Sequence, residues 1–136
     1  MRLTALAAFV LLAVAACGEE KENEQAGRAC GPPPAAMSAS PTLLPTDFPT
    51  PSRVTYTSEK SAGPAKIVTG YLDDDVDAAF DAYKEALGAG GYSVTKSEHE
   101  HVDAEVNFAG GSSTGQVKLL QECKDRTTVR ITARPA

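Results

Sequence analysis

The chain has 136 residues and a formal net charge of −5, from 18 acidic and 13 basic side chains. This length is typical of one small domain. Nucleic acids and anionic lipid head groups are recognised by dense clusters of Lys and Arg, so a mildly acidic chain disfavours both as partners.

The first sixteen residues have the composition of an export signal. Arg2 supplies a short positive start, and an uncharged apolar run follows from residue 3 to residue 16. A membrane-spanning helix needs about 20 apolar residues, so this run is too short to span a bilayer. We therefore predict that residues 1–16 are a signal peptide that is removed.

The segment Val-Ala-Ala-Cys at residues 14–17 resembles the lipobox of bacterial lipoproteins. The resemblance implies that Cys17 is diacylated and becomes the new N-terminus. Acyl chains would then anchor the protein to the cell membrane on its extracytoplasmic side. The alternative is an ordinary signal that is cut after an A-x-A-like site, with a cysteine nearby by chance.

Three cysteines occur in the chain. If Cys17 carries the lipid, Cys30 and Cys123 remain, and these two can form a disulfide in an oxidising compartment. Such a bridge would close a loop of about 90 residues and stabilise a domain too small for a large core. Two free thiols or a redox-active pair are the alternatives, although a catalytic pair more often has C-x-x-C spacing.

Residues 17–52 contain the candidate lipidated cysteine and seven of the nine prolines. Charged and Pro-rich segments without apolar periodicity bury too little surface to offset the cost of ordering, so we expect an extended or disordered tether. Within it, LPTDFPTP carries Leu43, Leu44 and Phe48, and this piece can lie against the domain as an extended strap.

Residues 53–136 are expected to form a small α+β domain. Two segments rich in β-branched residues, about 53–57 and 66–71, surround a turn and predict a β-hairpin. One helix is expected next. Its predicted start is marked by the acidic residues 73–75, its apolar stripe comprises Val76, Phe80, Tyr83 and Leu87, and the glycines from Gly88 onward end it.

Four further strands are predicted at about residues 92–98, 103–109, 116–122 and 127–134. Each alternates polar and apolar residues, which is typical of an antiparallel sheet with one solvated face. The predicted fold is therefore an antiparallel sheet of about six strands with one helix packed on one face, in the order ββαββββ.

The stretch EHEHVDAEVNF, residues 98–108, is a candidate metal site. If it is one strand, His101, Asp103 and Glu105 share the face opposite the apolar residues, and His99 joins them if the strand extends that far. Residues four apart on a strand are about 13 Å apart, too far to share one ion without a ligand from elsewhere. A solvated strand end or hairpin turn is the favoured interpretation, and no metal ligand is assigned.

Five basic residues are concentrated near the C-terminus. They alternate with Thr and apolar residues, as the exposed side of a strand does, so we expect a solvated face and no nucleic-acid site. These residues are Lys118, Lys124, Arg126, Arg130 and Arg134.

Three other motifs of specific function have less support in the sequence. Asp73, Asp75 and Asp77 have the first spacings of a calcium loop, but Ala78 and Lys84 stand where that loop needs Gly and Glu. The GGSSTG segment lacks the Lys of a phosphate-binding loop. The two histidines lie in one polar stretch and suggest no oriented catalytic base. We therefore expect no catalytic residues and no cofactor, so the protein is not expected to be an enzyme.

The lipobox, the Pro-rich tether and the segments DFPTPSRV, DAAFDAYKEAL, TGQVKL and TTVRIT together resemble small lipoproteins of high-GC bacteria. The resemblance implies a location and not an activity. We expect a membrane-anchored cell-envelope lipoprotein that acts as a non-catalytic binding or structural module, with an envelope protein as a possible partner. A metal or small-ligand carrier that uses residues 98–107 is the alternative.

Overall fold

The computed structural model describes residues 19–136, so the predicted signal peptide, residues 1–16, and Cys17 lie outside the described residues. Within residues 19–136, no helix is both long enough and apolar enough to cross a membrane. The elements in chain order are α1 (Glu19–Ala26), β1 (Val54–Ala62), β2 (Ala65–Leu72), α2 (Val76–Ala89), β3 (Ser93–His99), β4 (Asp103–Gly110), β5 (Ser113–Cys123) and β6 (Arg126–Pro135).

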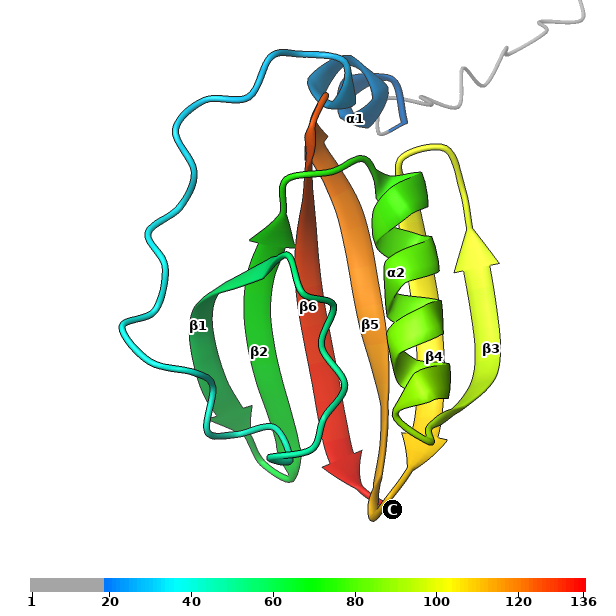
Figure 1. Cartoon of the computed structure of the whole chain (residues 1–136). Helices are drawn as coiled ribbons and strands as arrows, with labels where there is room; N and C mark the ends of the chain where they lie inside the picture. The colour runs from blue at the N-terminus through cyan, green and yellow to red at the C-terminus, as the bar shows by residue number, and fades with distance from the viewer. Residues whose placement is uncertain (1–18) are drawn as a thin grey trace, which may run out of the picture.

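The six strands form one antiparallel sheet in the spatial order β1-β2-β6-β5-β4-β3, and α2 packs on one of its faces (Figure 1). This confirms the predicted α+β class, the antiparallel sheet and the single packed helix. The order along the chain differs from the prediction because α1 precedes β1. The last strand, β6, lies inside the sheet, where it pairs with β2 on one side and β5 on the other.

Helix α2 begins and ends close to the predicted residues. Asp75 is its N-cap, and the Asp75 carboxylate accepts a hydrogen bond of 2.8 Å from the backbone N–H of Ala78. At the other end, the backbone N–H of Gly90 donates to the carbonyl of Ala86. The predicted apolar stripe is buried against the sheet, with Tyr83 and Leu87 fully inaccessible to solvent.

The hydrophobic core lies between α2 and the sheet. Alternate residues of the strands point into it, as the period of two predicts. On β6, for example, Val129, Ile131 and Ala133 are buried in this core, while the residues between them point to the opposite side of the sheet. We call the side of the sheet opposite α2 the helix-free face.

Residues 41–50, here called the strap, cover the part of the core that α2 leaves open. In Figure 1 the strap crosses β1 and β2 on the same side of the sheet as α2. Leu44 and Phe48 are buried in the core, and the Glu59 carboxylate accepts hydrogen bonds from the backbone N–H groups of Thr42 and Leu43 at 2.8 and 2.9 Å. Packed structure therefore begins before the expected domain boundary at residue 53.

The segment expected to be an extended or disordered tether also contains a helix, α1. Its sequence, EEKENEQA, consists largely of good helix formers, so a local helix can form without a hydrophobic stripe. The chain after α1 is held at the β5–β6 turn, where the N–H of Lys124 donates to the carbonyl of Arg28. Cys30 and Cys123 lie within disulfide distance there, with Cα atoms 5.2 Å apart, which is compatible with the predicted bridge.

Candidate functional site

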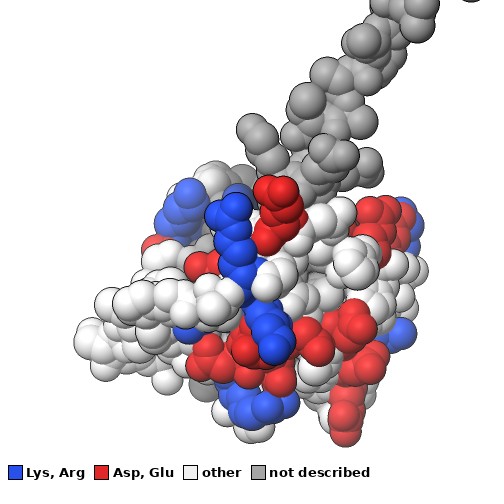
Figure 2. All heavy atoms as spheres, turned by 90° about the horizontal axis from the view of Figure 1, so that it is seen from above, with Lys and Arg blue, Asp and Glu red and all other residues white. Residues whose placement is uncertain are grey.

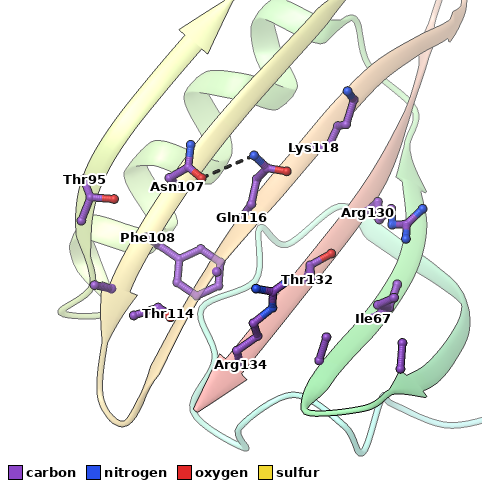
Figure 3. A pocket seen from close by; sticks show the side chains of 14 residues that line it. Ile67, Thr95, Asn107, Phe108, Thr114, Gln116, Lys118, Arg130, Thr132 and Arg134 are labelled. Atoms are coloured by element: carbon purple, nitrogen blue, oxygen red, sulfur yellow. Dashed lines mark hydrogen bonds between the residues drawn. The ribbon is translucent and has the colours of Figure 1, made fainter. Parts of the chain in front are cut away.

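The helix-free face carries a broad hollow. This hollow, here called the sheet groove, has a volume of about 800 Å³ and crosses the sheet from the β1–β2 turn to β3. Its lining combines polar and apolar residues in similar measure, and most of the side chains are drawn and labelled in Figure 3. The lining residues are Ala62, Ala65, Ile67, Thr95, Asn107, Phe108, Ala109, Thr114, Gly115, Gln116, Lys118, Arg130, Thr132 and Arg134.

Strand register places the floor of the sheet groove in one row across the sheet. Thr132 of β6 pairs with Ile67 of β2 on one side and with Gln116 of β5 on the other, and Gln116 pairs with Asn107 of β4. Ile67 is only 6% exposed, so the row has an apolar end at β2 and a polar end at β4. A ligand on this floor would meet one apolar surface and several neutral hydrogen-bonding groups.

The polar end of the floor is organised by side-chain hydrogen bonds. The Gln116 amide donates to the Asn107 carbonyl at 3.4 Å (Figure 3) and to the Glu105 carboxylate at 3.1 Å. The Lys118 ammonium donates to the same Glu105 carboxylate at 3.2 Å. Glu105 is therefore shared by two donors, and the charge of Lys118 is largely compensated within the protein.

Arg130 and Arg134 are the two positively charged side chains of the sheet groove whose charge no acidic residue in the described part of the chain compensates. They lie on the same face of β6, on either side of Thr132 along the strand. Both side chains are exposed, and within residues 19–136 neither forms an ion pair or a side-chain hydrogen bond. Their guanidinium groups are thus available to an anionic ligand.

The prediction of a solvated basic face holds for these two arginines but is wrong for Arg126. This residue is only 6% exposed, and its guanidinium donates to the Asp73 carboxylate at 3.1 Å and to the Gly31 carbonyl at 3.2 Å. It also lies over the Tyr71 ring, 5.2 Å from the ring centroid. Arg126 therefore fastens the segment after Cys30 to the sheet, because buried charge is stable only when it is paired.

The two histidines of residues 98–108 do not come together as a site. His99 ends β3 and pairs with Ala104, so it lies on the side of the sheet that α2 covers, not in line with Glu105 as we expected. The chain reverses at residues 100–102, which resets the alternation of side chains and leaves His101 in the turn.

His99 instead contacts α2. Its ring stacks on Phe80 at a centroid distance of 4.6 Å, and its Nε2 lies 2.9 Å from the Asp77 carboxylate. Within residues 19–136, no group of three His, Cys, Asp or Glu side chains is arranged to hold a metal ion. The arrangement gives His99 a packing role at the beginning of α2.

A second hollow, of about 670 Å³, lies under the strap and is lined by Leu44, Phe48 and Tyr56 among others. The Tyr56 hydroxyl is 2.8 Å from the Thr50 hydroxyl, and burial raises the Tyr56 pKa above its ordinary value. Burial, followed by the proximity of Tyr56, raises the pKa of the fully buried Tyr83 well above the ordinary value. Both tyrosines stay protonated at neutral pH, so this hollow offers no base for catalysis.

At the β3 rim of the sheet, Lys96 forms an ion pair of 2.6 Å with Glu98, and the hydrogen bond from this pair raises the Lys96 pKa. The geometry of the sheet groove suits non-covalent binding of a ligand that carries both negative charge and neutral polar groups.

Comparison of the chain with models of protein families gave no match, and a search of curated proteins found no relative.

The sequence contained part of the signal for this site. Arg130, Thr132 and Arg134 alternate with buried residues, so their common face could be predicted from β6 alone. Their neighbours Gln116 and Ile67 could not, because they come from strands whose pairing with β6 depends on the tertiary fold.

Proposed function

We propose that this chain is a lipid-anchored cell-envelope lipoprotein whose domain is a non-catalytic binding module. Acylation of Cys17 after removal of residues 1–16 would hold it to the cell membrane on the extracytoplasmic side. The domain would bind an envelope partner on its helix-free face. Neither nucleic acid nor a cofactor is part of this proposal.

The observation that carries the proposal is the sheet groove with its two uncompensated arginines. A face that serves only as solvated surface does not need cations gathered without acidic neighbours, because like charges that are close together destabilise a sheet. Lys118 lies directly opposite Arg130 in the β5–β6 pair, and Glu105, which accepts hydrogen bonds from Lys118 and Gln116, forms no ion pair with Arg130. A binding partner that supplies negative charge would remove this repulsion.

The fold also supports an anchored module. The proposed Cys30–Cys123 disulfide would fix the segment after α1 at the end of the sheet where β6 begins, and Arg126 already holds Gly31 at that end. Arg134 lies near the other end of β6, about 27 Å along the strand from Arg126. The chain that leads to the anchor therefore meets the domain far from Arg134, and this part of the sheet groove stays accessible to a partner.

The anchor is tested by replacing Cys17 with serine in the full-length protein and separating cells into membrane and soluble fractions. The native protein is expected in the membrane fraction. The Cys17→Ser variant is expected in the soluble fraction, and its mass should lack the acyl chains. Equal membrane association of the two proteins would contradict lipid anchoring.

The binding role is tested by photo-cross-linking in cells, with a photoreactive amino acid in place of Thr132 on the floor of the sheet groove. The matched control carries the same amino acid in place of Asp81, which is exposed on α2. One partner of defined mass should be captured from Thr132 and not from Asp81. Absence of any adduct from Thr132, or the same adducts from both positions, would refute a partner on the helix-free face.

The alternative, a metal or small-ligand carrier that uses residues 98–107, has less support because His99 is engaged with Asp77 and Phe80. Calorimetric titration of the oxidised protein with zinc or copper separates the two proposals. Submicromolar stoichiometric binding that disappears in a His99→Ala, His101→Ala double variant would favour the carrier.

A further inference from the structure

The spacing of the two groove arginines limits what can bind to both. Arg130 and Arg134 are four residues apart on one strand, so their Cα atoms are about 13 Å apart. Thr132 lies between them on the same face and leaves room for a neutral group. A ligand with two separated anionic groups can place one on each guanidinium group while both side chains stay extended from the strand.

An extended peptide has the same repeat as the strand beneath it. Two carboxylates four residues apart in such a peptide lie on one side of it, about 13 Å apart, and match the arginine spacing. The guanidinium group is planar and donates two parallel hydrogen bonds to a carboxylate, which makes arginine better suited than lysine to this contact.

The floor of the sheet groove fits a peptide better than a phosphate polymer. Ile67 is buried on this face, and it lies beside Thr132 in the neighbouring strand. The other neighbour of Thr132 is Gln116, whose amide can exchange hydrogen bonds with peptide groups. An apolar surface and an amide add little to the affinity for a polyphosphate. A peptide can contact the apolar surface with its side chains and the amide with its backbone.

The charge distribution of the rest of the molecule also favours binding of an acidic ligand on the helix-free face. Figure 2 shows the end of the molecule at which α2 begins, where acidic side chains surround several basic ones. Asp75, Asp77, Glu100 and Asp125 all line one hollow there. Lys124 lines the same hollow, but the four carboxylates make that end a less favourable place for an acidic ligand than the two arginines of the helix-free face.

We propose that the sheet groove binds an extended acidic peptide segment of an envelope protein, with carboxylates four residues apart on Arg130 and Arg134. This inference rests on the proposed binding function and names the chemistry of its partner. The residue midway between the two carboxylates lies over Thr132, and a neighbouring side chain contacts Ile67.

The test uses the detergent-solubilised full-length protein and two seven-residue peptides of identical composition. One peptide has glutamate at its second and sixth positions, and the other has glutamate at its second and fifth positions. In an extended chain the first pair lies on one side and the second pair lies on opposite sides. Affinities are measured by fluorescence anisotropy at low and high salt.

The first peptide is expected to bind at least about tenfold more tightly than the second. Arg130→Gln and Arg134→Gln should each weaken its binding by about tenfold, the loss that follows from about 1.4 kcal/mol. Affinity should also fall as salt screens the charges. The matched control, Lys124→Gln, removes one positive charge at the β5–β6 turn and should leave the affinity unchanged.

Equal affinity for the two peptides, no binding of either, or an equal loss in Lys124→Gln would overturn the proposal. A preference for polyphosphate or for vesicles of anionic lipid over the first peptide would do the same. The Thr132 cross-linking experiment separates this failure from failure of the proposed function. If the adduct persists in the Arg130→Gln, Arg134→Gln double variant, the helix-free face still binds a partner, but the partner is not an acidic peptide held by these arginines.

Discussion

Replacing Phe48 by alanine tests whether the strap is part of the hydrophobic core. Phe48 is 7% exposed, and its ring makes edge contacts with Tyr92 and Phe108 at centroid distances of 5.6 and 5.3 Å. Tyr92 and Phe108 also contact each other at 5.7 Å, so the three rings form one cluster. The substitution would therefore remove one member of a closed aromatic cluster.

The expected loss of stability in Phe48→Ala follows from these contacts. Burial of a phenylalanine side chain contributes about 1.5–3 kcal/mol, and each aromatic pair adds about 0.5–1.5 kcal/mol. With two pairs lost, we expect a decrease of about 3–5 kcal/mol in the free energy of unfolding, the range measured for Phe→Ala in protein cores. For a domain of this size this corresponds to a fall in Tm of about 12–20 °C.

The assay is urea unfolding followed by circular dichroism, with the disulfide state kept the same in all variants. Thr46→Ala is the matched control, because Thr46 is an exposed residue of the same strap, and its effect should stay within about 0.5 kcal/mol. A Phe48→Ala protein that loses less than about 1 kcal/mol would show that the strap does not pack on the sheet, and the argument from burial would fail.

Three other perturbations test separate contacts. Replacing Cys30 and Cys123 by alanine should lower the free energy of unfolding by about 4.7 kcal/mol, because the 93-residue separation gives a long closed loop; an unchanged urea midpoint after reduction of the native protein would argue against the bridge. Backbone N–H groups of the strap lower the Glu59 pKa from its ordinary 4.5, so the carboxylate stabilises the fold above that pH and the stabilisation is lost as pH falls through the lowered value. Glu59→Gln should accordingly unfold with a weaker pH dependence below about pH 4.5, and identical pH profiles would contradict this. Gly115→Ala places a methyl group against the Thr132 carbonyl and the Phe108 ring, so we expect a loss of about 1–3 kcal/mol; normal stability by thermal unfolding would show that the two strands are not this close.

Local features of the fold could be predicted from the sequence because each depends on spacing within one segment. The acidic residues 73–75, of which Asp75 is the cap, and the buried stripe through Tyr83 define α2, and both are readable from the sequence. The alternation of β6 likewise predicted which residues point into the core. The cysteine count indicated the pair that the structure brings within disulfide distance.

The position of His99 depended on tertiary structure. Its alternation with Glu105 holds only for an unbroken strand, and the turn at residues 100–102 reverses the chain and places His99 against Phe80. A hairpin turn changes which side of a sheet a residue faces, and this cannot be determined from periodicity when the turn itself is polar and short.

The sequence by itself determined the α+β class, the helix and the alternation of the strands, because these follow from local periodicity and capping. Tertiary structure alone decided that the strap completes the core through Phe48 and that β6 lies between β2 and β5. Only this pairing places Ile67 and Gln116 beside Arg130 and Arg134, because they come from strands separated from β6 by up to about 60 residues of chain. The sheet groove therefore exists only in the folded protein.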